Sequence, residues 1–307
     1  MSPAQGRPAQ GRPAQGLAPV LTASDAGAYR HLVLGSAAAS TALPGQFVAV
    51  AVGDGQSAML LRRAFSVHRA DPAAGTVEVV VAGHGAGTTW IASRSAGDAL
   101  DVVGPLGTGF TLPAAGRRLV LVGGGYGSAP FAWTAQAAVA AGVAVDVVVG
   151  AADEARLCDV DGIRAVVEPA GGCVLVTTDD GSAGDRGRVT DALAVLLGDG
   201  GAVVSDVAAC GPMGMLAAVA ATAREAGERS GHGVTVQVAV EEAMACGIGI
   251  CMTCVLPVRG DDGLTRMLRA CTDGPVLDAE RVRWDCVGAL GASVPADAVG
   301  APHGGAK

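Results

Sequence analysis

Residues 245–254 read ACGIGICMTC, and this stretch decides the architecture of the C-terminal part of the chain. It holds Cys246, Cys251 and Cys254 in a C-x4-C-x2-C spacing, and Cys271 follows in the segment RACTDG. This spacing, with one distant fourth cysteine, is typical of the ligands of a plant-type [2Fe–2S] cluster. The sequence therefore predicts that residues 241–290 form a small domain, poor in core residues, that a metal centre holds together.

The glycines between the cysteines support this interpretation. Gly247 and Gly249 let the backbone curl around a cluster and direct its N–H groups at the sulfurs. Structural zinc is an alternative, although zinc sites favour two C-x2-C pairs and this segment has one. Buried thiols without a metal are a second alternative. The other cysteines have no ligand spacing and are expected to be small buried apolar side chains: Cys158, Cys173, Cys210 and Cys286.

Upstream, residues 115–240 alternate between strand and helix signals. Apolar runs such as RRLVLVGGG, VAVDVVVGA, GCVLVTTDD and GVTVQVAVEE are typical of buried strands, whereas APFAWTAQAAVAAG, VTDALAVLLG and GMLAAVAATAREAG are typical of helices. Strands that alternate with helices of this length predict a parallel sheet with helices on its faces.

Two glycine-containing turns of this region are candidate nucleotide-binding motifs. In LVGGGYGSAP (121–130), Gly123, Gly125 and Gly127 lie between a strand and a helix that has Pro130 in its first turn. Such a turn offers free N–H groups to a pyrophosphate, although many glycine-rich turns bind nothing. The segment ACGPMG follows another strand and carries Cys210, Gly211 and Pro212. Because ligands of open α/β sheets bind along the carboxyl ends of the strands, the pair of motifs favours nucleotide binding.

Residues 17–114 contain short β runs separated by Gly, Pro, Asp and Ser about every ten residues. This pattern predicts a small antiparallel barrel or sandwich. Arg63 and Ser66 in RRAFS, with Gly87 and Thr88 in GAGTTW, form a candidate phosphate site, because Arg grips phosphate in a bidentate manner and hydroxyls add donors. An ordinary surface pair of Arg and Ser is the alternative.

Composition excludes several other classes of protein. Half of the 307 residues are hydrophobic, which suits two or three packed domains, and 47 glycines predict many tight turns. The net charge of −8 and the absence of basic runs argue against nucleic-acid binding. The apolar stretch 132–150 is interrupted by polar residues and is expected to be a helix followed by a strand, not a membrane span.

The two ends of the chain are expected to be tails. Residues 1–16 repeat a Pro-Ala-Gln-Gly-Arg unit that cannot bury apolar surface, and residues 291–307 end in APHGGAK. Residues 1–16 have no apolar core segment and so do not resemble a secretory signal, which makes the cytoplasm the expected location. The chain is thus expected to be multidomain: a β-barrel (17–114), an α/β domain (115–240) and a [2Fe–2S] domain (241–290).

Taken in order, the motifs resemble the electron-transfer subunit of class 1B dihydroorotate dehydrogenase, within the ferredoxin-reductase-like superfamily. The resemblance runs from about residue 17 to residue 287 and rests on these segments: Arg63-x-x-Ser66, GAGTTW, GGGYGSAP, TTDDGSAGDRGRVTD, ACGPMGML, EEAMACGIGICMTC and ACTDGPVLDAERVRWD. It implies a flavin-binding barrel, a pyridine-nucleotide domain and a C-terminal cluster domain.

The resemblance also implies the residues of each site. FAD would be held by Arg63, Ala64, Phe65, Ser66, Val80, Val81, Ala82, Gly87 and Thr88, and the cluster by Cys246, Cys251, Cys254 and Cys271. The chain departs from the family at three positions. Ala64 stands where the family usually has Pro, Tyr126 where it often has an aliphatic residue, and Thr253 where it often has Gly. None of these departures removes a cluster ligand, although Tyr126 could alter nicotinamide stacking.

These implications lead to one hypothesis. In an FMN-containing catalytic partner, dihydroorotate is oxidised for pyrimidine (UMP) synthesis; electrons cross the [2Fe–2S] cluster singly, and FAD collects two and passes a hydride to NAD⁺. The cofactors carry the redox chemistry, so no catalytic acid or base is assigned. NAD is favoured over NADP because two pairs of carboxylates, Asp153–Glu154 and Asp179–Asp180, follow strands of the α/β domain, where they suit ribose hydroxyls and repel a 2′-phosphate.

Two other functions fit the same motifs. One is a stand-alone NAD(P)H reductase for a ferredoxin, haem or oxygenase component, which needs no catalytic partner. The other is a non-catalytic iron–sulfur sensor or scaffold, which would lack bound flavin. The leading hypothesis implies a heterotetramer with two subunits of each kind, and an exposed apolar patch beside the cluster where the partner docks.

Overall fold

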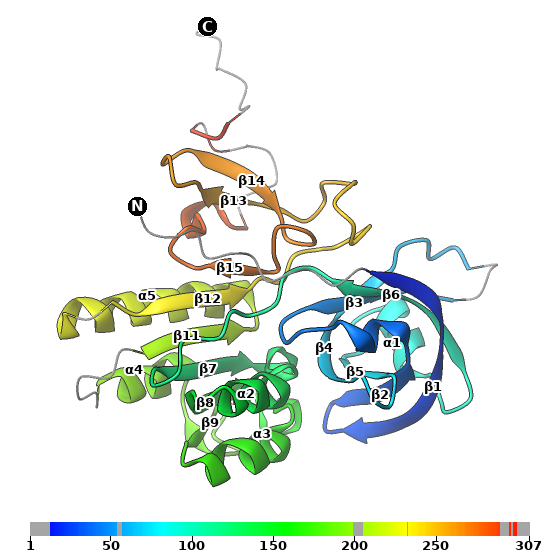
Figure 1. The fold of residues 1–307 in the computed structure, drawn as a ribbon, viewed down its shortest axis with the longest axis horizontal. Helices are drawn as coiled ribbons and strands as arrows, with labels where there is room; N and C mark the ends of the chain where they lie inside the picture. Colours follow the sequence, from blue (N-terminus) through cyan, green and yellow to red (C-terminus); the bar gives the residue numbers. More distant parts are fainter. Residues whose placement is uncertain are drawn as a thin grey trace, which may run out of the picture.

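The computed structural model of the chain describes residues 13–53, 57–198, 205–231, 233–288, 295 and 297–299. A β-barrel, a sheet flanked by helices and a smaller unit carrying the cysteines meet at the centre of the molecule (Figure 1). The predicted multidomain fold class is confirmed. Strand β1 begins at Ala14, so the expected tail of residues 1–16 is too long by three residues; residues 1–12 lie outside the described part of the chain.

The barrel closes in the order β1-β2-β5-β4-β3-β6, with antiparallel neighbours throughout. Its β5 alternates as a half-buried strand should: Val77, Val79 and Val81 are at most 1% exposed, whereas Glu78 and Val80 lie on the outer face. The strands are β1 (Ala14–Ala26), β2 (Tyr29–Gly35), β3 (Phe47–Val50), β4 (Arg63–Asp71), β5 (Thr76–Val81) and β6 (Ala99–Leu106), and the barrel also carries helix α1 (Ala86–Ala92).

The α/β domain is built around a sheet of order β10-β9-β8-β7-β11-β12-β15, in which the strands from β10 to β12 are parallel. Helices cover both faces: Leu119 and Leu121 pack with α2 and α3, and Val120 and Val122 with α4 and α5. The strands are β7 (Arg118–Gly124), β8 (Ala144–Ala151), β9 (Val174–Thr178), β10 (Asp185–Arg186), β11 (Ser205–Cys210), β12 (Thr235–Ala239) and β15 (Val276–Asp278), and the helices are α2 (Phe131–Ala140), α3 (Val160–Val167), α4 (Val189–Gly198) and α5 (Met213–Ser230). The stretch 132–150 is indeed a helix followed by a strand, and no helix in the described ranges is long and apolar enough to cross a membrane.

The unit that carries the cysteines has more core than its sequence predicts. Its hairpin of β13 (Val255–Arg259) and β14 (Thr265–Arg269) places Leu256 and Val258 in one hydrophobic cluster with Leu216 of α5. Its third strand, β15, pairs antiparallel with β12 and so completes the sheet of the neighbouring domain. Packing against the α/β domain, and not a metal centre alone, therefore orders this unit.

Part of the expected C-terminal tail is also packed. Ala298 forms an isolated bridge with Thr265 of β14, and the Val299 N–H donates to the Thr265 carbonyl at 2.8 Å. Asp297 pairs with Arg283 at 2.6 Å. Residues 297–299 of the expected tail (291–307) thus pack on the β13–β14 hairpin, whereas the end segment APHGGAK lies outside the described part of the chain.

Asp146 of β8 generates a prediction about stability. Its carboxylate accepts hydrogen bonds from the Arg118 guanidinium and, at 2.8 Å, from the Cys173 N–H. Burial opposes ionisation, but these donors outweigh it and hold the pKa of Asp146 below its usual value. Replacing Asp146 by Ala should lower the free energy of unfolding by about 2–3 kcal/mol, because a half-buried cation and an N–H lose their acceptor.

The stabilisation from Asp146 should be present above pH 3.8 and disappear as the pH falls through the lowered pKa of the folded state. Urea unfolding at pH 7 and below pH 4 measures both effects. Asp161→Asn, on the exposed face of α3, is the control and should change little. An equal loss in the free energy of unfolding for Asp146→Ala and Asp161→Asn at pH 7 would contradict the stabilising role of Asp146.

Candidate functional site

The four predicted cluster cysteines meet at one end of the β13–β14 hairpin. Cys246, Cys251 and Cys254 lie in the loop between β12 and β13, here called the cysteine loop (residues 240–254), and Cys271 follows β14. The hairpin register pairs Val255 with Arg269, so the residues just beyond that pair also meet. The Cys271 N–H donates to the Cys254 sulfur at 3.4 Å.

The cysteine loop directs backbone donors at sulfur, as its glycines predict. Gly247 and Gly249 have φ of +73° and +81°, which glycine adopts most readily, and the Ile248 N–H points at the Cys246 sulfur at 3.5 Å. Desolvation opposes ionisation of Cys246, but hydrogen bonds from the N–H groups of the loop and from Cys251 lower its pKa to about 6.

Cys254 and Cys271 form a second pair of sulfurs, and as two thiolates they would need a cation beside them. Burial and the adjacent Cys254 thiol raise the pKa of Cys271 to about 12. Two neighbouring thiols in a buried position resist forming two anions unless a positive charge lies between them. The donor set therefore fits a metal centre bound by thiolates.

The arrangement in two pairs favours a two-iron cluster over one zinc ion. Among the described residues, no three of these sulfurs lie within 4.8 Å of one another. Four thiolates at about 2.3 Å from one tetrahedral zinc ion would all lie that close. The contacts instead couple Cys246 with Cys251 and Cys254 with Cys271, as two irons with two cysteines each require.

Thr253, one of the departures noted in the sequence, contacts this site directly. Its hydroxyl donates to the Cys251 sulfur at 3.2 Å. Hydrogen bonds to the sulfurs of a cluster stabilise the reduced, more negative state. A glycine at this position would lack that donor.

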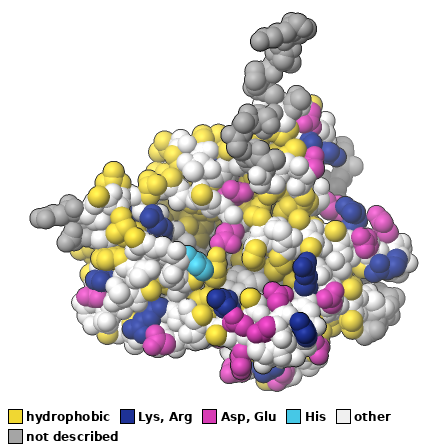
Figure 2. Space-filling model, turned by 180° about the vertical axis from the view of Figure 1, so that it is seen from behind, with side chains coloured by type: hydrophobic (Ala, Val, Ile, Leu, Met, Phe, Trp, Pro, Cys, Tyr) yellow, Lys and Arg dark blue, Asp and Glu magenta, His cyan; other side chains and the backbone are white. Residues whose placement is uncertain are grey.

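A cavity of about 520 Å³, here called the central cavity, lies where the three units meet. Figure 2 shows a hollow in the middle of the back face, with hydrophobic atoms in it and acidic side chains at its edge. The barrel contributes Arg63, Ala64, Phe65, Ser66, Val80, Ala82 and Thr88, the α/β domain contributes Gly127, Cys210 and Gly211, and the cysteine loop contributes residues that include Ala245 and Thr253.

The two candidate phosphate motifs of the barrel come together at this cavity. Gly87 packs against Arg63 so closely that an added Cβ would lie 2.8 Å from the guanidinium Nε and Nη2 atoms. Thr88 accepts hydrogen bonds from the His84 and Gly85 N–H groups and so orders the loop before α1. Val81 points into the barrel core and does not line the cavity.

A second cavity, of about 620 Å³ and here called the sheet-edge cavity, follows the carboxyl ends of the parallel strands. Gly124 at the end of β7, Gly125 directly after it, Gly150 of β8 and Thr177 of β9 line it, as does Pro212. Gly123 lines neither cavity, because it packs against Ser128 and Phe131. Gly127, Cys210 and Gly211, which belong to the predicted nucleotide motifs, line the central cavity instead.

Tyr126 and His84 stand between the two cavities and contribute to the lining of both. The Tyr126 hydroxyl donates to Glu241 at 2.6 Å, and burial together with that carboxylate raises its pKa. Tyr126 also meets the Tyr29 ring edge-on at 6.0 Å. Sequence reasoning marked Tyr126 as unusual, but His84, Glu241, Arg156 and Arg188 carried no local signal of a site.

Comparison with known proteins agrees with this geometry. Residues 241–283 match the iron–sulfur cluster binding domain of dihydroorotate dehydrogenase B, and residues 121–221 match the oxidoreductase NAD-binding domain. The chain is 33% identical to "Dihydroorotate dehydrogenase B (NAD(+)), electron transfer subunit" from Desulforamulus reducens, over 80% of this chain and 89% of the relative. The protein of that name from Bacillus caldolyticus is 38% identical, over 78% and 86%.

The chain belongs to this family of electron transfer subunits. It is therefore an oxidoreductase subunit with an iron–sulfur cluster domain and an NAD-binding domain, which confirms the resemblance seen in the sequence. The structure of an NADH-dependent reduced ferredoxin–NADP oxidoreductase, described in connection with flavin-based electron bifurcation, is also similar. It has a TM-score of 0.74 and 31% identity, over 88% of this chain and 91% of that chain. The relatives favour the leading hypothesis over a stand-alone reductase.

The cysteine pairs of this electron transfer subunit generate the second prediction. Cys251→Ser should lose most of its iron and the cluster EPR signal of the reduced protein, because a two-iron cluster needs all four thiolates. Iron and sulfide counts with EPR measure this. Cys286→Ser, in the same domain but outside the pairs, should keep both. A Cys251→Ser protein with full iron content and an unchanged spectrum would refute the ligand assignment.

Proposed function

We propose that this subunit carries electrons between a catalytic partner and NAD(H) by way of a [2Fe–2S] cluster and FAD. The observation that supports this proposal most directly is that the central cavity adjoins both the cysteine loop and the sheet-edge cavity. Ala245 and Thr253 of the cysteine loop line the central cavity, and Tyr126 and His84 lie between it and the sheet-edge cavity. A flavin can take one electron at a time from a cluster and exchange a hydride with a nicotinamide. A flavin in the central cavity would lie between the other two sites.

The lining of the central cavity supports its assignment to FAD. Arg63 provides a guanidinium for phosphate, Ser66 provides a hydroxyl, and Phe65 and Val80 provide apolar surface. The central cavity has a volume in the usual range for sites of small molecules and cofactors. We propose as FAD-binding residues the same set that the resemblance implies. Within this set, Gly87 acts by positioning Arg63, and Val81 acts by anchoring strand β5 in the barrel core.

Gly87→Ala should weaken FAD binding about 10–100-fold, because the new methyl group displaces the Arg63 guanidinium and a charge-assisted phosphate contact is worth about 1.5–3 kcal/mol. Titration of the deflavinated protein, followed by flavin fluorescence, measures the affinity. Gly85→Ala is the matched control, since an added Cβ there meets nothing within 4 Å. Similar FAD affinities for both variants would refute the role of Arg63.

The sheet-edge cavity is proposed as the NAD(H) site. It lies at the carboxyl ends of parallel strands and beside the N-terminal part of α5, through Pro212 and Gly214. Asp179 lines it after β9, which supports a preference for NAD, whereas Asp153 pairs with Arg156 and Asp180 with Ser182. Arg156 and Arg188 also line this cavity and partly offset the carboxylate.

Turnover should be at least about fivefold more efficient with NADH than with NADPH, because a 2′-phosphate near the Asp179 carboxylate costs roughly 1 kcal/mol or more. Steady-state kcat/KM for the reduction of an artificial acceptor measures the ratio. Asp179→Asn should lower the ratio of kcat/KM for NADH to kcat/KM for NADPH. A preference for NADPH in the unaltered protein would contradict the proposal and would point to Arg156 and Arg188 as a phosphate site.

The partner is proposed to be the FMN-containing catalytic subunit, in a heterotetramer with two subunits of each kind. Large apolar side chains beside the cluster support a docking surface there: Ile248, Ile250 and Met252 are 52%, 75% and 51% exposed. Exposed apolar groups were expected at this place, because the cluster must exchange electrons across a close interface. The cytoplasm remains the proposed location, and eight cysteines that form no disulfide in the described part of the chain suit its reducing conditions.

The function is tested by purifying the chain together with its catalytic subunit. Reduction of NAD⁺ by dihydroorotate should require both proteins, and Ile250→Asp should lower it by about tenfold or more, since a charge in an apolar interface is costly. Reduction of ferricyanide by NADH needs no partner and should stay unchanged. Leu264→Asp, an exposed position of the same domain in the β13–β14 turn, is the control. Full dihydroorotate activity in the Ile250→Asp complex, or in either protein alone, would refute the proposal.

A further inference from the structure

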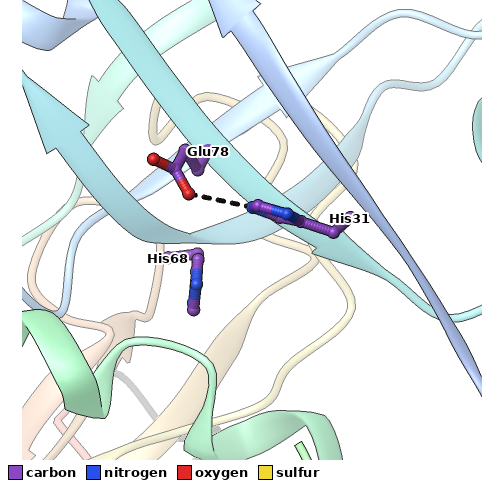
Figure 3. Close-up of side chains that lie close together, drawn as sticks. All are labelled: His31, His68 and Glu78. Carbon is purple, nitrogen blue, oxygen red and sulfur yellow. Dashed lines mark hydrogen bonds and ion pairs between the residues drawn. The ribbon is translucent and has the colours of Figure 1, made fainter. Parts of the chain in front are cut away.

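A cluster of two histidines and a carboxylate lies outside both cavities, on the outer face of the barrel. His31 of β2, His68 of β4 and Glu78 of β5 come from three neighbouring strands, and their ligand atoms all lie within 4.8 Å of one another (Figure 3). His68 owes its position to a bulge, because the pairing of β4 with β5 shifts register between Val67 and Arg69. Bulges of this kind redirect a side chain.

The hydrogen bonds of His68 leave one ring nitrogen available. Its Nδ1 lies 2.5 Å from the Ala129 carbonyl oxygen, to which it can only donate. The neutral tautomer then has a lone pair on Nε2. Histidines that bind metals commonly donate their other N–H to a backbone carbonyl in this way.

A second carboxylate reaches the cluster from the α/β domain. Asp159, at the start of α3, places Oδ2 3.6 Å from His68 Nε2, and this oxygen is buried without a hydrogen-bond partner. Burial raises the pKa of Asp159, so its charge is expensive there without a cation. The hydrogen bond from His31 has the opposite effect on Glu78 and lowers its pKa.

The spacing fits a small divalent ion. His31 Nε2 and Glu78 Oε2 are 2.9 Å apart, and two ligands bound at about 2.0 Å to a tetrahedral zinc ion lie about 3.3 Å apart. Two neutral imidazoles and two carboxylates carry a charge of −2, which a divalent ion balances, although Arg69 also faces the carboxylates. The side chains of His31, Glu78 and Asp159 are about one-quarter exposed, which leaves an entry path.

We propose that His31, His68 and Glu78, completed by Asp159, bind one zinc-like divalent ion at the seam between the barrel and the α/β domain. The ion takes the place of the proton that His31 Nε2 shares with Glu78, which leaves that nitrogen, and it gives the buried Asp159 oxygen beside His68 a ligand role. It ties α3 to the barrel and so holds the central and sheet-edge cavities at a constant separation. The site does not involve the cluster cysteines and does not depend on the proposed electron path.

The test is zinc uptake by the intact protein with its cluster and flavin loaded. After dialysis against buffered zinc, one zinc ion per chain should be found by mass spectrometry with the iron content unchanged, and the zinc X-ray absorption edge should show nitrogen and oxygen ligands without sulfur. His31→Gln and Glu78→Gln should weaken zinc binding by more than about tenfold, the least that loss of a supporting partner costs. Asp159→Asn should weaken it as well, and the zinc-dependent rise in Tm should disappear.

Asp161→Asn is the matched control, since Asp161 lies on the same helix, fully exposed, and should leave zinc binding unchanged. Flavin absorbance and circular dichroism verify that each variant is folded. If the protein takes up no zinc, His31 and Glu78 form only a hydrogen-bonded pair, and the proposal is overturned. Uptake that persists in His31→Gln and Glu78→Gln, sulfur in the zinc shell, or zinc gained at the expense of iron would overturn it as well.

Discussion

The antiparallel pairing of β15 with β12 is the constraint on which the rest of the structure depends. Pro275, directly before β15, lines the central cavity, and the Gly274 carbonyl accepts a hydrogen bond from Thr108 at the end of the barrel. Cys271 lies only a few residues upstream. One short segment thus joins the cysteine pairs, the barrel and the sheet, so that three units assembled from distant parts of the chain share a single cavity.

Close approach of backbone to backbone makes this junction possible. A Cβ on Gly127 would lie 2.4 Å from the Cys210 carbonyl oxygen, so the turn after β7 can touch the end of β11 because Gly127 has no side chain. These two strands flank the point where the strand order reverses, which is where open α/β sheets bind their ligands. The glycine motif therefore brings the end of the sheet close to the central cavity, in addition to offering backbone N–H groups to a ligand.

Much of the architecture could be predicted because its signals are local. Alternating apolar runs and helix-length segments mark the α/β domain, and Val77, Val79 and Val81 mark a half-buried strand. The short helix α3 was missed, since its eight residues include Asp161 and Gly162 and its helical state depends on packing of Ile163 and Val167. The cluster domain was expected to have little core for a similar reason: its apolar residues complete a core that belongs mostly to another domain.

By itself, the sequence determined which four cysteines are proposed as cluster ligands and the order of the domains, because a fixed spacing of cysteines and the period of apolar residues follow from local chemistry. Tertiary structure alone decided that Tyr126 meets Glu241, that Gly127 faces the central cavity, and that His31, His68, Glu78 and Asp159 gather at one seam. These contacts join residues far apart in the chain. Strand register and domain packing create them, and neither leaves a pattern in the neighbouring sequence.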